Sequence, residues 1–215
     1  MRRFLRVFTS GLLILLALGS YIFYEYTLKE KLESVREKLI LVASNASLSI
    51  DTDQLLRIPL NKEGDKTEEY RAVYQKLYSI KKMNPFIKFI YIMKATDRPG
   101  ILQYIVDVDP LPDTVTAESP TAFPGDEYDA RNVPEMLKAY SGPTADRGPT
   151  ADVWGTVISG YAPLYGDTGE AVAILCVDTD GTGIYGGQRT AWIRSFFISL
   201  IVITVLIPLF LRMEV

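Results

Sequence analysis

The sequence predicts an α+β domain held between two transmembrane helices. Three observations support this prediction. An uncharged apolar run lies near each end of the chain, helical periodicity follows the first run, and strand-like segments separated by turns occupy the later part of the sequence. The two runs, Val7–Tyr24 and Ser195–Leu211, contain 18 and 17 residues, close to the roughly 20 residues that a helix needs to cross a bilayer. The sequence between them is long enough for one domain with its own core.

The charges and aromatic residues that flank the two runs indicate their orientation. Arg2, Arg3 and Arg6 precede the first run, and positive flanks stay in the cytoplasm. We therefore expect the chain to be anchored in the inner (cytoplasmic) membrane with its domain extracytoplasmic. A small-residue stretch, Ala17-Leu18-Gly19, leaves open a cleaved signal peptide, which would also place the domain outside.

These boundaries define the expected order of segments along the chain. They are a cytoplasmic N-terminus (1–6), a first transmembrane helix (7–24), a stalk helix (25–50), the extracytoplasmic domain (51–185), a second transmembrane helix (191–211) and a cytoplasmic end (212–215).

The composition excludes several classes of function. Five of the 23 basic residues and one of the 26 acidic residues lie outside 25–190, so this segment carries 18 basic and 25 acidic residues. This excess of acidic residues argues against a nucleic-acid partner, because a protein that binds nucleic acid needs a basic face. The chain has no histidine and one cysteine, Cys176, so it has no Ser-His-Asp triad, internal disulfide or cysteine-clustered zinc site. We therefore expect the chain to have no enzymatic activity, no cofactor and no metal ion. We also expect Cys176 to be buried.

Helical periodicity resumes directly after the first apolar run. Apolar residues recur at alternating spacings of four and three, which is typical of a heptad seam: Leu28, Leu32, Val35, Leu39, Val42 and Ala46. Two interpretations remain open. The seam predicts either a parallel homodimer stalk or a single helix that packs on its own domain.

A second helix is indicated before Asn84-Pro85, which should end it. Asp65 and Glu68 are spaced as in a capping box, and the apolar and aromatic residues between 70 and 77 recur at helical spacing. We expect this tyrosine-rich stripe to belong to the core.

The segments after Pro85 are typical of strands joined by turns. A hairpin is predicted from 87–94 and 101–108 around the turn at 98–100, and two further strands from 156–164 and 170–177 around the turn at 165–169. A short helix is expected over 132–140, with Pro134 in its first turn. The result is a mainly antiparallel sheet of at least four strands with helices beside it.

Two kinds of polar residue could bear chemistry. Paired aspartates at strand ends, Asp107 with Asp109 and Asp178 with Asp180, would share one face of a strand, but we interpret them as solvated carboxylates. More informative is a set of aromatic and hydroxyl side chains near the sheet, because a small-ligand pocket has apolar walls and a few orienting polar groups. This set comprises Tyr91, Tyr104, Tyr128, Trp154, Ser159 and Tyr161.

Several motifs resemble extracytoplasmic Cache domains, the PAS-like sensor domains of bacterial receptors. The runs Asp152–Leu164 and Asp167–Asp178 resemble the C-terminal hairpin of these domains. Asn84–Met93 resembles their first strand, and Tyr128-Asp-Ala with Pro134-Glu-Met-Leu resembles the segment between. The resemblance covers roughly 49–180.

The resemblance implies a five- or six-stranded PAS-like antiparallel sheet behind a long N-terminal helix. It also implies a small-molecule ligand, often an amino acid or another carboxylate, bound over one face of the sheet. We expect Tyr91, Tyr104, Trp154 and Tyr161 to form the walls of the pocket, and Asp178 to accept a hydrogen bond from a donor such as an amine. The Arg-x-Trp-Tyr element of amino-acid-binding relatives is missing, which argues against amino-acid sensing.

The leading hypothesis is therefore the ligand-sensing input module of a homodimeric transmembrane receptor, either truncated at Val215 or a stand-alone membrane sensor. Two alternatives remain. One is a non-sensing membrane assembly subunit whose Cache-like domain only mediates contact, which a pocket filled by its own side chains would favour. The other is a membrane enzyme, disfavoured by the missing histidine.

Overall fold

The structure is a computed structural model that describes residues 2–108, 122–152 and 155–184, together with residues 193, 194, 196, 197, 200 and 201. It divides into two compact units, Ser34–Gly181 and a second unit of Met1–Glu33 with Thr182–Val215. Most of the predicted helix 191–211 lies outside the described residues. Among those that are described, no helix combines the length and the apolar character that a membrane crossing requires.

The chain begins with one continuous helix, α1 (Arg2–Ser47). Within the unit Ser34–Gly181, α1 buries Leu39, Ala43 and Ala46. Two residues of the predicted heptad seam, Leu39 and Ala46, thus pack inside their own domain, as the second interpretation of the seam expected. The parallel dimer stays a prediction.

Two short helices and one longer helix follow α1: α2 (Thr52–Leu56), η1 (Gly64–Lys66) and α3 (Glu68–Met83). The predicted capping box was wrong about the residue that starts α3. Thr67 is the N-cap, and its hydroxyl accepts a hydrogen bond from the Tyr70 amide at 3.2 Å. Asp65 lies in η1 instead, because a 3-10 turn inserts before the helix. The helix ends at Asn84 as predicted.

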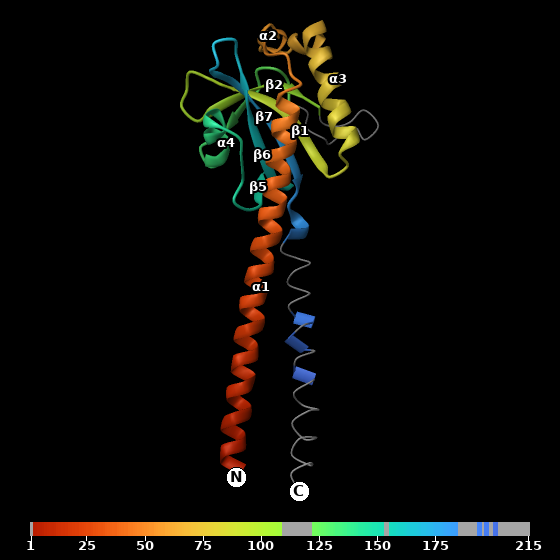
Figure 1. The fold of residues 1–215 in the computed structure, drawn as a ribbon. Coiled ribbons are helices and arrows are strands. Elements are labelled where there is room, and N and C mark those ends of the chain that lie inside the picture. The colour runs from red at the N-terminus through yellow and green to blue at the C-terminus, as the bar shows by residue number, and fades with distance from the viewer. Residues whose placement is uncertain are drawn as a thin grey trace. The chain divides into compact units, whose positions relative to one another are not determined.

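The described residues of the domain form one antiparallel sheet of seven strands, whose neighbours follow the order β3-β2-β1-β7-β6-β4, with β5 paired to β6 (Figure 1). Four strands are long and confirm the two predicted hairpins: β1 (Ile87–Ala95), β2 (Ile101–Asp107), β6 (Gly155–Tyr165) and β7 (Ala171–Asp180). Three strands are only two or three residues long: β3 (Glu127–Asp129), β4 (Thr144–Ala145) and β5 (Thr150–Asp152). These short edge strands raise the count above the five or six that the resemblance implied.

Helices cover the two faces of the sheet. A Cβ atom at position 160 of β6 would lie 2.6 Å from Leu39 Cβ, so α1 packs directly on the face that Gly160 occupies. Tyr161 points to the opposite face, because side chains alternate along a strand. On that face, the cluster around Tyr161 includes Val133, Met136 and Ala139, which come from or flank the short helices α4 (Pro134–Lys138) and η3 (Ala139–Ser141).

Candidate functional site

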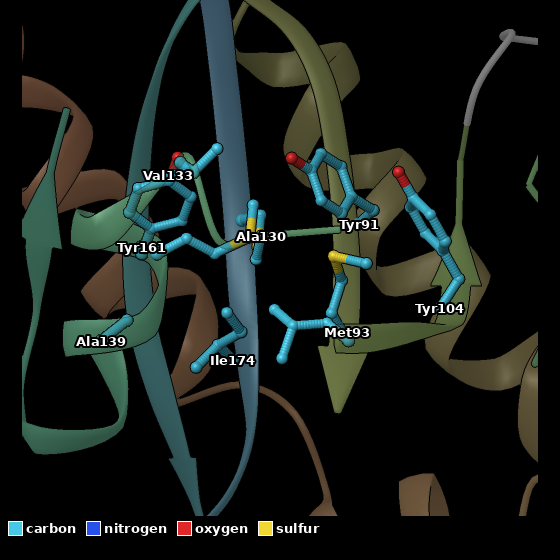
Figure 2. Close-up of a cluster of buried hydrophobic side chains, with 11 residues drawn as sticks. Tyr91, Met93, Tyr104, Ala130, Val133, Ala139, Tyr161 and Ile174 are labelled. Atoms are coloured by element: carbon cyan, nitrogen blue, oxygen red, sulfur yellow. The ribbon is translucent and has the colours of Figure 1, made fainter. Parts of the chain in front are cut away.

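Three of the predicted site residues lie side by side on the sheet face that α4 covers, here named the tyrosine face. Tyr91 on β1 and Tyr161 on β6 both pair with Cys176 of the intervening strand β7. Tyr104 on β2 packs against Tyr91 with ring centroids 5.5 Å apart. The three hydroxyl groups point toward the same end of the sheet (Figure 2). The tyrosine face therefore presents a row of oriented hydroxyls above an apolar floor.

Asp178 lies at the end of the sheet to which these hydroxyls point. On β7 it is paired with Phe89 of β1 and Ser159 of β6. It lies two residues after Cys176, so the two side chains are on the same face of the sheet. Its side chain is buried, with 4% of the residue exposed. Its charge contributes to raising the pKa values of Tyr91, Tyr104 and Tyr161, although burial is the larger cause in each case. The structure thus brings Asp178 together with the three predicted tyrosines.

Two further ionisable groups belong to this end of the tyrosine face, and the sequence did not single them out as site residues. Lys81 of α3 is buried and interacts electrostatically with Asp107 and Asp178. Burial lowers the pKa of Lys81 to about 8, and the two carboxylates oppose that shift. Burial likewise raises the pKa of Asp107 to about 7, although the hydrogen bond from the Ala122 amide and the charge of Lys81 both lower it. Clustered groups with perturbed pKa values in one place make it a candidate functional site.

The carboxylates contradict one expectation from the sequence. Asp107 and Asp178 were expected to be solvated at strand ends, and both are buried. The reason is that Tyr70 of α3 donates a hydrogen bond to the Asp107 carbonyl at 3.1 Å, and α3 thereby closes over the end of β2. Asp180, two residues past Asp178, is exposed as expected, and Asp109 lies outside the described residues. Trp154, the remaining predicted wall residue, also lies outside them.

Tyr161 is held by a carboxylate that the sequence analysis did not select. Its hydroxyl donates to Asp146 Oδ1 at 2.9 Å, and the Ser159 amide donates to Asp146 Oδ2 at 3.1 Å. Asp146 is buried, and burial raises its pKa while the bonds from Tyr161 and Ser159 lower it. Because the Tyr161 hydrogen is directed at Asp146, the oxygen of this hydroxyl can offer a ligand only an acceptor.

The lower part of the tyrosine face is closed by the protein's own side chains. Met93, Ile174 and Ala139 lie below the tyrosine rings, whereas Val133 lies beside the hydroxyl end of Tyr161 (Figure 2). Met136 belongs to the same cluster. Cys176 is buried at the centre, as predicted. The upper end is polar and carries the tyrosine hydroxyls, the carboxylates of Asp107 and Asp178 and the ammonium of Lys81.

An open groove of about 390 Å³ adjoins this site between α4 and β5. Its lining includes Glu135, Asp146 and Arg147. Glu135 is buried and accepts hydrogen bonds from Lys138 Nζ at 3.0 Å and Arg147 Nε at 2.8 Å. The groove therefore has a fixed, charge-balanced wall and reaches the Asp146 that holds Tyr161.

This arrangement of an antiparallel sheet, a long N-terminal helix on one face and a short helix over the other is the fold of extracytoplasmic Cache, or PAS-like, sensor domains. The sensor domain of the Vibrio cholerae histidine kinase DctB superposes with a TM-score of 0.54 at 14% identity, over 84% of this chain and 60% of that chain. This chain thus spans less than two thirds of the DctB sensor domain.

Two other solved structures are similar at lower scores. The ligand-binding domain of the Campylobacter jejuni chemoreceptor Tlp3 with L-valine has a TM-score of 0.41 at 13% identity, over 82% of this chain and 60% of that one. The Escherichia coli DcuS sensor domain has a TM-score of 0.40 at 13% identity, over 78% and 98%. Neither a protein-family model nor a curated protein sequence matches the chain.

Proposed function

We propose that the chain is the ligand-sensing input module of a transmembrane signalling receptor, with its domain outside the cell. The observation that carries this proposal is the convergence of Tyr91, Tyr104, Tyr161 and Asp178 on one face of a sensor-domain fold, beside the buried pair Lys81 and Asp107. Burying Lys81, Asp107 and Asp178 is costly, and binding of a charged ligand would offset part of that cost.

The chemistry of the site favours a ligand with an amine. Asp178 is a buried acceptor, and Tyr161 offers a ligand only an acceptor because its hydrogen is directed at Asp146. An ammonium group donates up to three hydrogen bonds and satisfies both. Lys81 supplies a positive charge for a carboxylate, so a zwitterion also fits the set.

The membrane setting rests on the sequence. Two uncharged runs flank the domain, and the arginines before the first run favour a cytoplasmic N-terminus. Together with the fold, they support anchoring in the inner membrane with the domain extracytoplasmic. We also propose that the chain is a homodimer without enzymatic activity, in which ligand binding shifts the packing of the membrane helices through differential affinity for two states.

The proposal is tested by screening the full-length chain in detergent micelles. Free amino acids and simple alkylamines are the probes, and their N-acetylated forms are the controls. We expect amines to raise the melting temperature and N-acetylated forms not to. Asp178→Asn should weaken binding roughly 10- to 150-fold, because a hydrogen bond to a charged group contributes about 1.5–3 kcal/mol at about 1.4 kcal/mol per decade.

Asp180→Asn is the matched control, since it removes the same charge from an exposed position on the same strand. It should bind the amine as wild type does. If Asp178→Asn also binds as tightly as wild type and only melts earlier, Asp178 is structural and the site is misassigned.

A second candidate function is a non-sensing membrane assembly subunit. The observation in its favour is that Val133, Met136 and Ala139 pack onto the tyrosine face, and that Tyr161 is only 1% exposed. A screen in which no probe shifts the melting temperature, while the chain co-purifies stoichiometrically with another membrane protein, would favour it.

A further inference from the structure

One short segment of β6 is held from both faces of the sheet. On the tyrosine face, Asp146 accepts hydrogen bonds from the Ser159 amide and the Tyr161 hydroxyl. On the opposite face, Gly160 lies against Leu39 of α1 so closely that a Cβ atom there would be 2.8 Å from the Leu39 carbonyl carbon. The segment 159–161 therefore cannot move on one face without disturbing the other.

The same Asp146 is bound to α1 through its backbone. Arg36 Nε donates to the Asp146 carbonyl at 2.9 Å, and Arg36 Nη2 donates to the Ala145 carbonyl at 3.3 Å. Arg36 and Leu39 are three residues apart and so lie on one side of the helix. A single turn of α1 thus holds β4 through Arg36 and β6 through Leu39.

We propose that Asp146 is a positioning residue that couples the Tyr161 hydroxyl to α1. The coupling element, named the Asp146 junction, consists of Arg36, Leu39, Asp146, Gly160 and Tyr161. The inference rests on the proposed function, because a receptor needs a connection between its ligand site and the helix that leads toward the membrane.

The physical basis is that one residue serves both contacts. The Asp146 carboxylate fixes Tyr161, and the Asp146 carbonyl accepts from Arg36. A ligand that draws Tyr161 toward itself pulls on the carboxylate, and β4 must rotate or release it. Either response changes the carbonyl position that the Arg36 guanidinium requires, since charge-assisted hydrogen bonds are strongly directional.

The test is amide hydrogen exchange on the ligand-free, full-length chain in detergent micelles. Tyr161→Phe should accelerate exchange in residues 34–47 of α1 at least about 5-fold, the lower end of typical couplings between sites. If the junction connects the two elements in both directions, Arg36→Gln should also accelerate exchange in residues 155–165 of β6. If Arg36→Gln does not fold, Arg36→Lys keeps the charge but loses the two-pronged contact and provides the same measurement.

Tyr91→Phe is the matched control, because it removes a buried hydroxyl from the same face on β1, two strands away from β6. The proposal is overturned if Tyr161→Phe changes α1 no more than Tyr91→Phe does, or if the Arg36 variant leaves β6 unchanged. No ligand enters the measurement. A failed ligand screen therefore counts against the proposed function, whereas an unresponsive α1 counts against the coupling alone.

Discussion

Replacing Gly160 by alanine tests how α1 is packed on the sheet. A Cβ atom at this position would lie 2.6 Å from Leu39 Cβ, 2.8 Å from the Leu39 carbonyl carbon and 3.0 Å from its oxygen. Two of these three atoms are backbone atoms of a helix, so no side-chain rotation relieves the contact. The helix or the strand must move apart instead.

The size of the effect follows from that geometry. Overpacking a core costs typically 1–3 kcal/mol, and we expect about 3 kcal/mol because the clash involves backbone. For a protein of 150–250 residues, each kcal/mol lowers the melting temperature by roughly 2–4 °C. Thermal unfolding of the full-length chain, followed by circular dichroism, should therefore show a fall of roughly 6–12 °C.

Gly183→Ala is the matched control. No atom lies within 4 Å of a Cβ at that position, so the same substitution should leave the melting temperature unchanged or slightly raised, since alanine favours helix over glycine. If Gly160→Ala melts within about 2 °C of this control, α1 does not rest on β6 at Gly160, and the Asp146 junction loses one of its two contacts with α1.

Three further predictions concern the buried charges, the stalk and the topology. Burial raises the pKa of Asp107 to about 7 from 3.8, so the wild-type protein should lose stability as the pH rises from about 4 to 7. Asp107→Asn should remove up to about 4 kcal/mol of that loss, at 1.36 kcal/mol per pKa unit. Urea midpoints of both proteins measured across this pH range test the prediction, and parallel curves would refute it. Val35→Cys should form a dimer crosslink under mild oxidation, whereas Leu39→Cys should not, because Leu39 is 1% exposed within its own domain. Equal yields of crosslinked dimer from the two variants on a non-reducing gel would contradict an ordered parallel seam. A reporter enzyme that is active only outside the cytoplasm should be active when fused after Gly142, and an inactive but well-expressed fusion would exclude the proposed orientation.

The sequence predicted the four long strands and both hairpins because turns and β-branched runs are local signals. The helix before Pro85 was equally visible, but its start was not. Asp65 and Thr67 are both good N-cap residues, and only the 3-10 turn at Gly64–Lys66 decides between them. The sequence could not decide what the apolar seam of α1 packs against for a related reason. A heptad pattern of apolar residues is compatible with packing on a second helix and with packing on a sheet.

The candidate site was predicted where strand alternation determines it. Tyr91 and Tyr161 are on one face because both pair with Cys176, and Tyr104 follows from the neighbouring strand. Lys81 and Asp146 were missed because contacts far along the chain bury them. Asp146 directly follows a two-residue strand with no periodicity, and Lys81 reaches the aspartates only because α3 folds back over β1 and β2. A charged residue on the apolar stripe of α3, four residues after Leu77, was the one available signal for Lys81.

The buried position of Cys176 makes the native thiol a reporter of how often the tyrosine face is uncovered. Burial raises its pKa well above the ordinary value, so the sulfur stays protonated and a thiol reagent reacts only while the side chains that cover the tyrosine face have moved away. Since Cys176 is the single cysteine of the chain, the labelling rate of the unmodified protein measures how often that happens. Slower labelling in the presence of an amine would then reveal a ligand without any mutation.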